Sequence, residues 1–361
     1  MRKIKWLAGL CGLLLLAGCA EKSNILGPEL SEEPVSLAES IDPHAGFAKN
    51  SLTGLYDIPA DKLDSRPVSI MINNLEQAQK VQTGLQGADL VYEVEVEGGI
   101  SRYMAVYKHI AAAPDIGTIR SARYTYGDLA MGHDAIFIHH GIDKGYATPH
   151  FKDIGLTRYE IGDPDPGYRS NPFKLGVEHT LFTVGTKLDA YLDKQKARRT
   201  TDRTAPWQPY LEPEESVTPT AGGVCNSLAV NYSARYISRF DYDSNIGRYL
   251  RLQNAAPHKD YKTGQQLAVD NVFVLYTRVY ALSDKVHMKS DLDSGDGIYA
   301  SKGGYEPILW KKGSAGASFV MTRPDGSALT PNTGKGWICI QSQARPAVIT
   351  GAPEPSSEPA E

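Results

Sequence analysis

The sequence has no excess of positive charge: Lys and Arg total 38, Asp and Glu total 42, and the formal net charge is −4. A nucleic-acid binder needs a basic face to neutralise phosphates, so this balance argues against that class of protein. Hydrophobic residues make up 41% and charged residues 22% of the chain, which excludes wholesale disorder. The abundant glycine, proline and tyrosine favour turns and strands over a helical bundle.

The common catalytic and zinc signatures are also missing. The chain has no P-loop, no Gly-x-Ser-x-Gly elbow, no His-Glu-x-x-His and no paired Cys-x-x-Cys. The acidic stretch 291–297 fails the calcium-loop register, because its fifth and sixth positions are Gly295 and Asp296 and no Glu stands at the twelfth. We therefore expect a tight turn there, and we expect no cofactor and no metal site.

Cysteine is scarce, with four in 361 residues. Cys11 and Cys19 lie in the N-terminal leader, which leaves Cys225 and Cys339. An oxidising compartment would permit a bridge between these two. The alternative is that both are small buried hydrophobic residues, and the strand-like context of Cys339 favours this interpretation.

The N-terminus carries the clearest signal in the chain. Three basic residues precede an apolar run over residues 6–17, which is shorter than the roughly 20 residues that a permanent membrane span needs. The run ends in Leu16-Ala17-Gly18-Cys19, which resembles a bacterial lipobox. The resemblance implies a signal peptide over 1–18, cleavage before Cys19 and acylation of that cysteine. An ordinary signal peptide that contains a cysteine is the alternative.

Such a leader predicts a lipid-anchored protein on the extracytoplasmic face of the cell membrane. Cleavage removes three basic residues and no acid, so the formal charge of the mature chain falls from −4 to −7. An acidic protein gains no attraction to an anionic membrane surface, so the lipid must provide the anchoring.

Composition divides the remainder of the chain into five segments. These are a disordered tether (19–65), an N-terminal domain (66–197), a linker or long surface loop (198–223), a C-terminal domain (224–345) and a disordered tail (346–361). The first domain is predicted to be α/β or α+β with a mixed sheet, and the second to be mostly β. We expect the two to be separable folded blocks.

The periodicity predicts individual elements in both blocks. In the first block we expect strands at 68–73, 101–109 and 135–140, and helices at 124–133 and 185–194. In the second block we expect hairpins at 236–252 and 318–329 and a strand at 271–282. Residues 88–99 fit either a strand or a helix.

A charged cluster lies in the first block. Glu93 and Glu97 are expected side by side whether their segment is a strand or a helix, and Arg102, Arg120 and Arg123 follow. One interpretation is internal salt bridging that holds a loop. The other is a pocket for an anionic ligand, since arginine forks suit carboxylates and phosphates.

Two histidines are further candidates for ligand binding. His139 and His140 end the strand predicted at 135–140, where ligands often sit in open α/β sheets. Only one of the two can face a given cleft, because side chains alternate along a strand. His179 follows Glu178. A lone histidine is usually structural, but one at a strand end is a better candidate than average.

Several motifs together resemble the YerB-like family of bacterial lipoproteins, which are built of two domains of unknown function. They are 87–93, 97–106 and 116–123 in the first block, and 240–243, 249–251, 308–312 and 332–338 in the second. The resemblance covers most of residues 66–341. It implies a location at the cell envelope and a two-domain architecture, but it implies no activity.

Two function classes therefore stand. The first is a non-catalytic envelope lipoprotein that binds an anionic envelope ligand or a partner protein. The second is an enzyme that acts on cell-envelope polymers or lipid-linked phosphates. If the seven candidate side chains converge in one concave pocket, the ligand or enzyme interpretation gains; if they scatter as pairwise bridges, a scaffold is the better account.

Overall fold

The computed structural model describes residues 44–351. The predicted signal peptide, Cys19, most of the predicted tether and the end of the predicted tail lie outside the described residues.

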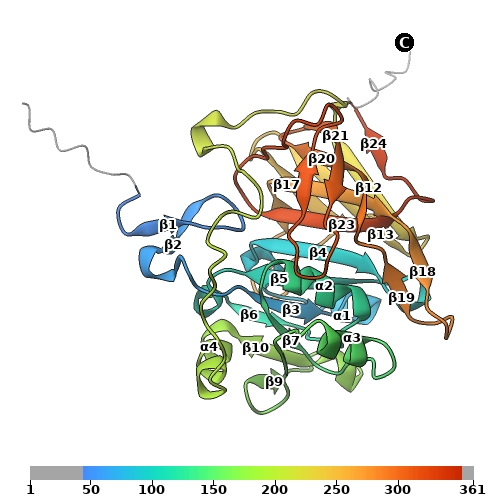
Figure 1. Cartoon of the computed structure of the whole chain (residues 1–361). Coiled ribbons are helices and arrows are strands. Elements are labelled where there is room, and N and C mark those ends of the chain that lie inside the picture. The colour runs from blue at the N-terminus through green and yellow to red at the C-terminus, as the bar shows by residue number, and fades with distance from the viewer. Residues whose placement is uncertain (1–43, 352–361) are drawn as a thin grey trace, which may run out of the picture. The chain divides into compact units, whose positions relative to one another are not determined.

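One large mixed sheet runs through both halves of the chain (Figure 1). Its strands, in order across the sheet, are β11 (Gly223–Val224), β21 (Gly304–Lys311), β20 (Ser294–Ser301), β17 (Asn271–Thr277), β23 (Gly336–Ser342), β4 (Leu90–Glu95), β5 (Ser101–Tyr107), β3 (Val68–Ile72), β7 (Ile136–His139) and β8 (Arg158–Glu160), with β22 (Val320–Thr322) paired to β21.

The two halves meet inside this sheet at β4 and β23. These strands pair in parallel, with Val91 opposite Trp337 and Glu93 opposite Cys339. The strands around this seam are buried on both faces, which explains their almost continuous apolar sequences. Both Cys225 and Cys339 are buried and unbridged.

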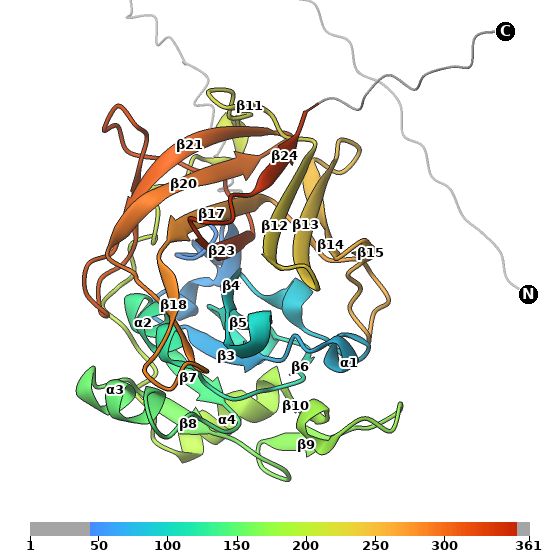
Figure 2. The ribbon, with the colours of Figure 1, turned by 90° about the vertical axis from the view of Figure 1, so that its right-hand side faces the viewer.

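A second sheet, formed by the second half, lies against one face of the large sheet (Figure 2). Its path is β15 (Ala256–Pro257), β14 (Arg248–Gln253), β13 (Tyr236–Asp243), β12 (Ser227–Ser233) and β24 (Val348–Thr350), with β16 (Ala268–Val269) paired to β14. All its pairs are antiparallel, and burial alternates along β12 as expected for a sheet with one face inward.

Helices cover the first-half strands. On one face, α2 (Tyr124–Gly132) and α3 (Ala147–Asp153) pack with Met71 and Phe137. On the other, α4 (Gly185–Lys194) and a small sheet of β6 (Asp115–Gly117), β10 (Leu181–Val184) and β9 (Gly167–Arg169) pack with Ile70.

The remaining elements are short. They are β1 (Phe47–Lys49), β2 (Tyr56–Pro59), η1 (Ala60–Lys62), α1 (Glu76–Gln79), η2 (Leu85–Gly87), η3 (Glu97–Gly99), η4 (Ile110–Ala112), η5 (Val177–His179), η6 (Pro213–Glu215), β18 (Val279–Ala281) and β19 (Met288–Ser290).

The fold class is confirmed: a mixed sheet with helices in the first half, and mostly antiparallel strands in the second. The predicted strands at 68–73, 101–109 and 135–140 correspond to β3, β5 and β7, and the predicted helices to α2 and α4. The strand interpretation of 88–99 holds for β4, so the helix alternative is wrong.

Three predictions about segment boundaries need correction. Residues 44–65 are not tether, because β1 and β2 pair and Leu52 is buried. The predicted linker 198–223 packs inward through Trp207 and Tyr210, whose side chains both hydrogen-bond to the Leu52 carbonyl. The predicted tail contributes β24. These segments are polar in composition, but the few apolar side chains in them pack against residues that are far away in the sequence.

The expectation of separable blocks is also corrected, because the seam between β4 and β23 makes one sheet from both halves. A buried ion pair reinforces this seam. Glu93 Oε2 of β4 lies 3.2 Å from Arg251 Nη2 of β14, and neither side chain has any exposed surface. Glu93 also accepts hydrogen bonds from Ser238 Oγ at 2.7 Å and Trp337 Nε1 at 2.9 Å in the second half, and from Ser101 Oγ at 2.6 Å.

Arg251 is enclosed by aromatic rings. Its guanidinium carbon lies 4.4 Å from the centroid of Trp337 and 5.3 Å from that of Tyr103. It also donates to the Tyr103 hydroxyl at 2.9 Å. Cation–π contacts and hydrogen bonds thus replace the water that both charges lost on burial.

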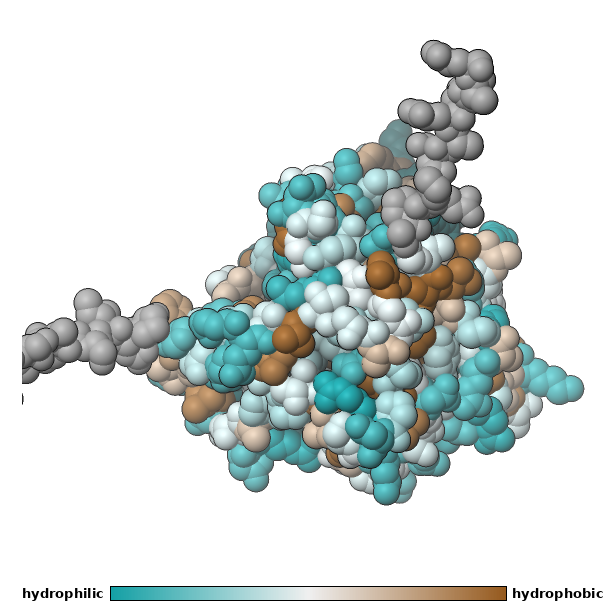
Figure 3. Space-filling model, turned by 90° about the horizontal axis from the view of Figure 1, so that it is seen from above, coloured by the Kyte–Doolittle hydropathy of each residue, from teal (hydrophilic) through white to brown (hydrophobic). Residues whose placement is uncertain are grey.

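The face drawn in Figure 3 has no single continuous hydrophobic area. Hydrophobic residues there form separate patches among hydrophilic and neutral residues. Exposed apolar side chains of this kind are normal on a folded protein.

We expect Arg251→Ala to lower the free energy of unfolding by about 3–5 kcal/mol, because it leaves the Glu93 carboxylate buried without its counter-ion. Arg278→Ala is the matched control. Arg278 pairs with Asp291 at 2.9 Å, but 70% of its side chain is exposed, so its loss should leave the free energy of unfolding close to that of the wild type. Urea unfolding measures both values, and equal losses would contradict the role given to Arg251.

Candidate functional site

The seven predicted ligand-binding residues do not form one group. Glu93 belongs to the buried ion pair described above. Glu97 lies beyond the end of β4, where Gly98 adopts a φ of 72° and turns the chain. The expectation that Glu93 and Glu97 lie side by side is therefore wrong. Glu93 contacts Ser101 and Glu97 contacts Arg102, and these consecutive residues of β5 point to opposite faces of the sheet.

Glu97 is the centre of a group that we call the arginine cluster: Glu97, Arg102, Arg120 and Arg123. Arg123 donates from Nε to Glu97 Oε2 at 2.8 Å and also bonds the carboxylate through Nη2, which makes a two-point contact. Arg102 Nη2 lies 3.6 Å from Glu97 Oε1, and its Nη1 donates to the Ser121 carbonyl at 2.7 Å.

Burial alone would raise the pKa of Glu97, but the hydrogen bond from Arg123 and the charges of Arg102 and Arg123 lower it to about 2. Burial and the neighbouring Arg123 charge lower the pKa of Arg102 to about 10. Glu97 is therefore an anion and Arg102 a cation at neutral pH.

Arg120 has no ion pair within 4 Å among residues 44–351, and its Nε is buried without a hydrogen-bond partner there. Burial lowers its pKa, and the charge of Glu178 opposes this effect. The charge of Arg120 in turn acts on both Arg102 and His179, so these groups are electrostatic neighbours.

His179 lies at the edge of the arginine cluster. Its Nδ1 accepts from Asn73 Nδ2 at 2.9 Å, so the neutral ring carries its proton on Nε2, which lies 3.6 Å from Glu178. Burial lowers the pKa of His179.

The His139 side chain bonds none of the arginine cluster side chains among the described residues, although the backbone beside it pairs with the 120–122 segment. It is fully buried, donates from Nδ1 to the Gly141 carbonyl at 2.8 Å and accepts from Arg158 at 3.1 Å. Its burial and Arg158 lower its pKa to about 4. Its neighbour His140 is the partly exposed member of the pair, with Nε2 3.3 Å from Arg169.

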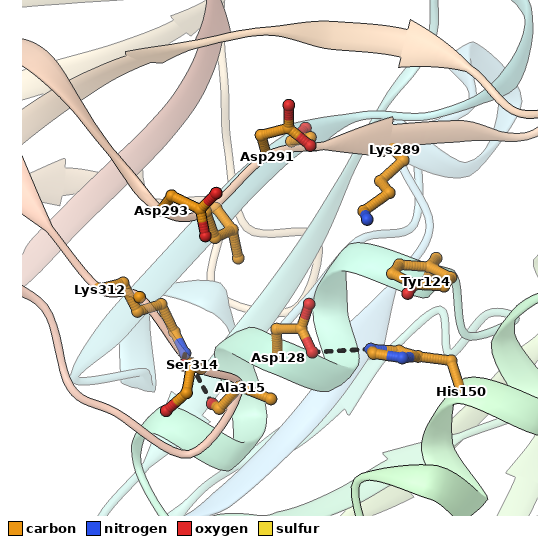
Figure 4. Close-up of a pocket in the computed structure, with 12 residues that line it drawn as sticks. Tyr124, Asp128, His150, Lys289, Asp291, Asp293, Lys312, Ser314 and Ala315 are labelled. Carbon is orange, nitrogen blue, oxygen red and sulfur yellow. Dashed lines mark hydrogen bonds and ion pairs between the residues drawn. The ribbon is translucent and has the colours of Figure 1, made fainter.

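None of the seven predicted residues lines the hollow drawn in Figure 4. This hollow, which we call the interdomain hollow, has a volume of about 220 Å³ and takes its walls from both halves of the chain. α2 and α3 contribute Tyr124, Asp128 and His150, and the loops around β19–β22 contribute Lys289, Ser290, Asp291, Leu292, Asp293, Lys312, Gly313, Ser314 and Ala315.

A close approach of α3 to α2 builds the first wall. A Cβ on Gly127 would lie 2.2 Å from the Phe151 ring, so only glycine permits this spacing. The approach places His150 Nε2 2.7 Å from Asp128 Oδ1 and stacks the His150 and Tyr124 rings at 3.8 Å. Lys289 Nζ lies 5.0 Å from the centroid of Tyr124.

Lys312 forms part of the second wall. It is buried, and its ammonium group donates to the carbonyls of Ser314 and Ala315 at 2.7 and 2.6 Å. Burial lowers its pKa to about 8, although the charge of Asp128 opposes this shift. Of the turn predicted at 291–297, only residues 291–293 join β19 to β20, because 294–297 already belong to β20. These three residues place Asp291 and Asp293 at the same hollow.

Sequence reasoning missed this hollow because its residues come from four separate segments with no shared motif. The acidic turn was the one available signal. Within residues 44–351, no group of three or more His, Cys, Asp or Glu side chains is placed to hold a metal ion.

Two family models match the chain. The model described as "Protein of unknown function (DUF3048) N-terminal domain" matches residues 52–218, and the one described as "Protein of unknown function (DUF3048) C-terminal domain" matches residues 228–338. Together these matches cover most of the chain. The chain belongs to the YerB-like family.

A relative in Bacillus subtilis (strain 168), named "Putative lipoprotein YerB", is 24% identical over 353 residues, which make up 94% of this chain and 96% of the relative. The crystal structure of the YerB protein from Bacillus subtilis aligns with a TM-score of 0.71 and covers 84% of this chain and 99% of that chain. The YerB-like fold is therefore shared along nearly the whole of that structure.

The buried histidines of this YerB-like chain predict a loss of stability in acid. Burial lowers the pKa of His133 to about 3 and that of His139 to about 4, and it holds the pKa of His258 well below its usual value. Below about pH 6.5 the unfolded chain binds protons at these sites and the folded chain does not, so each histidine costs ~1.4 kcal/mol per pH unit.

The buried Asp89 carboxyl stabilises the folded state as the pH falls, which is opposite to the effect of the histidines. Its burial raises its pKa to about 6, so between about pH 6 and pH 4 it offsets roughly one histidine. Urea unfolding at pH 6.5 and pH 4.5 should therefore show a net loss of stability as the pH falls. His139→Gln should reduce the slope of this loss by ~1.4 kcal/mol per pH unit. An unchanged slope would contradict a neutral His139.

Proposed function

We propose that this chain is a lipid-anchored protein of the cell envelope that binds an anionic ligand at the arginine cluster. The single observation that carries the binding part is the imbalance of charge there. Arg102 and Arg123 share one carboxylate, Glu97, and Arg120 has no ion-pair partner within 4 Å among the described residues.

Among the three arginines of the cluster, Arg120 has the fewest protein partners to compensate for its lost hydration. A partly buried guanidinium with a buried, unpartnered Nε loses hydration without a compensating hydrogen bond. Glu178 offers only a distant charge, since its one ion-pair contact within 4 Å among the described residues is to His179. A phosphate or carboxylate oxygen would supply the missing acceptor.

Arg102 and Arg123 prepare the site in a different way. Glu97 and nearby backbone carbonyls already hold both guanidinium groups in place. A ligand that meets side chains with fixed positions loses less conformational entropy on binding. The planar arginine fork also favours oxyanions with two acceptor oxygens.

The anchoring part rests on the leader and on the relative's name. The basic start, the short apolar run and the lipobox ending at Cys19 fit acylation of that cysteine. The relative in Bacillus subtilis carries the word lipoprotein in its name. In residues 44–351 there is no helix with the length and apolar character to cross a bilayer.

Phosphate should raise the melting temperature of the wild-type protein, because a ligand that binds only the native state stabilises it. Arg120→Ala should weaken phosphate binding by about 1–3 kcal/mol, through loss of a charge-assisted hydrogen bond, while the fold persists. Differential scanning calorimetry with increasing phosphate measures both effects.

Arg239→Ala is the control for general loss of positive charge. Arg239 is a partly exposed arginine that pairs with Asp241 in the second sheet. If phosphate shifts the melting temperatures of the Arg120→Ala and Arg239→Ala variants equally, the arginine cluster is not the binding site.

Cys19→Ala should release the protein from the membrane fraction without unfolding it, because the acyl chains attach to that thiol. Fractionation of cells followed by immunoblotting measures this outcome. A variant that stays with the membrane as firmly as wild type would contradict lipid anchoring at Cys19.

A further inference from the structure

We infer that the interdomain hollow binds a neutral polyhydroxylated molecule, of the size of one sugar unit. This site is distinct in its residues from the arginine cluster, and the inference does not depend on the anion bound there. The argument rests on the hydrogen-bonding groups that the hollow leaves unused, on their charges and on its volume.

The first unused group is the hydroxyl of Ser290, which lines the hollow. Ser290 is 2% exposed, and its Oγ is buried with no hydrogen-bond partner among the described residues. A buried hydroxyl without a partner costs free energy, so a native structure rarely keeps one unless something else supplies the bond. A hydroxyl can both donate and accept.

The acceptors are carboxylates on opposite walls. Asp128 uses Oδ1 for His150, and no bond to its Oδ2 is found among the described residues. Asp293 is exposed and has no side-chain hydrogen bond or ion pair within the described part of the chain. Figure 4 shows both carboxylates at the border of the same space.

Donors lie among these acceptors. Figure 4 places the Lys289 ammonium group on one side of the Tyr124 ring and His150 on the other. The Tyr124 ring is thus held between two groups, which leaves its hydroxyl as a donor. The Lys289 ammonium group bonds Tyr280 and has three N–H donors, so it can also donate to a ligand. Lys312 is already bonded to two carbonyls and serves to hold the loop over residues 312–315.

This mixture of charges decides the class of ligand. Lys289 and Lys312 would repel a cationic ligand, and Asp128, Asp291 and Asp293 would repel an anionic one. A neutral polyol avoids both repulsions, and its hydroxyls donate to the carboxylates while they accept from lysine, tyrosine and serine. The apolar walls that dominate drug-like pockets are missing here, since Leu292 is the one aliphatic side chain larger than alanine in the lining.

The volume limits the size. Pockets for drug-sized ligands enclose roughly 300–1,000 Å³. At about 220 Å³, the interdomain hollow suits a single sugar ring or the end unit of a glycan.

The test compares three pyranose sugars of nearly equal size and different charge: glucose, glucosamine as the cation and glucuronate as the anion. Dissociation constants come from titrations followed by protein NMR at pH 7. We expect glucose to bind more tightly than both charged analogues. Tighter binding of glucosamine or glucuronate, or no saturable binding of glucose, would overturn the proposal.

Two variants locate the site. Ser290→Ala should weaken glucose binding about five- to tenfold and leave the melting temperature unchanged or higher, because the hydroxyl it removes has no partner in the fold. Asp293→Asn should weaken binding to a similar extent. Ser294→Ala and Asp296→Asn are matched controls on β20 that do not line the hollow, and they should bind glucose as wild type does.

Arg120→Ala separates this site from the arginine cluster. It should keep full glucose affinity while losing phosphate affinity. Wild-type glucose affinity in both Ser290→Ala and Asp293→Asn would show that glucose binds elsewhere, and the proposal would then fail whatever the outcome of the phosphate experiment.

Discussion

The rest of the structure depends on the ion pair between Glu93 and Arg251. Glu93 lies on β4, the first-half strand that pairs with β23 at the seam of the large sheet, and Arg251 lies on the second sheet that packs across it. Three of the four hydrogen-bond partners of Glu93 described above come from the second half of the chain. Because an unpaired charge cannot stay in that interior, the two halves must be docked for either residue to be accommodated.

This constraint explains why the two predicted blocks behave structurally as one body over residues 44–351. The parallel pairing of β4 with β23 gives the halves a continuous backbone ladder. Segments that look like connectors add to it. The stretch before β3 and the stretch between the halves meet through the Leu52 carbonyl and the Trp207 and Tyr210 side chains. The connection between the halves is thus packed rather than solvated.

The two candidate sites depend on this docking to different degrees. The arginine cluster uses residues of the first half alone, held by Glu97 and by backbone carbonyls of the same half. The interdomain hollow has one wall from α2 and α3 and the other from loops around β19–β22, so it exists only in the docked chain. An event that loosened the seam would remove the hollow before it disturbed the arginine cluster. The two sites are therefore formed by different elements, and only the interdomain hollow requires contact between the halves.

Local periodicity and composition were enough to predict the leader hypothesis, the two-part architecture, the elements β3, β5, β7, α2 and α4, and the arginines around Glu97. Neighbouring residues carry all of these signals. Three features could be seen only in the folded chain: Glu93 is buried in an ion pair between the halves, His139 is buried in the sheet, and Asp128, His150, Lys289 and Lys312 line one hollow. The buried position of Glu93 depends on pairings as far apart along the chain as the 244 positions between it and Trp337. Such pairings are set by sheet register and packing that no local pattern records.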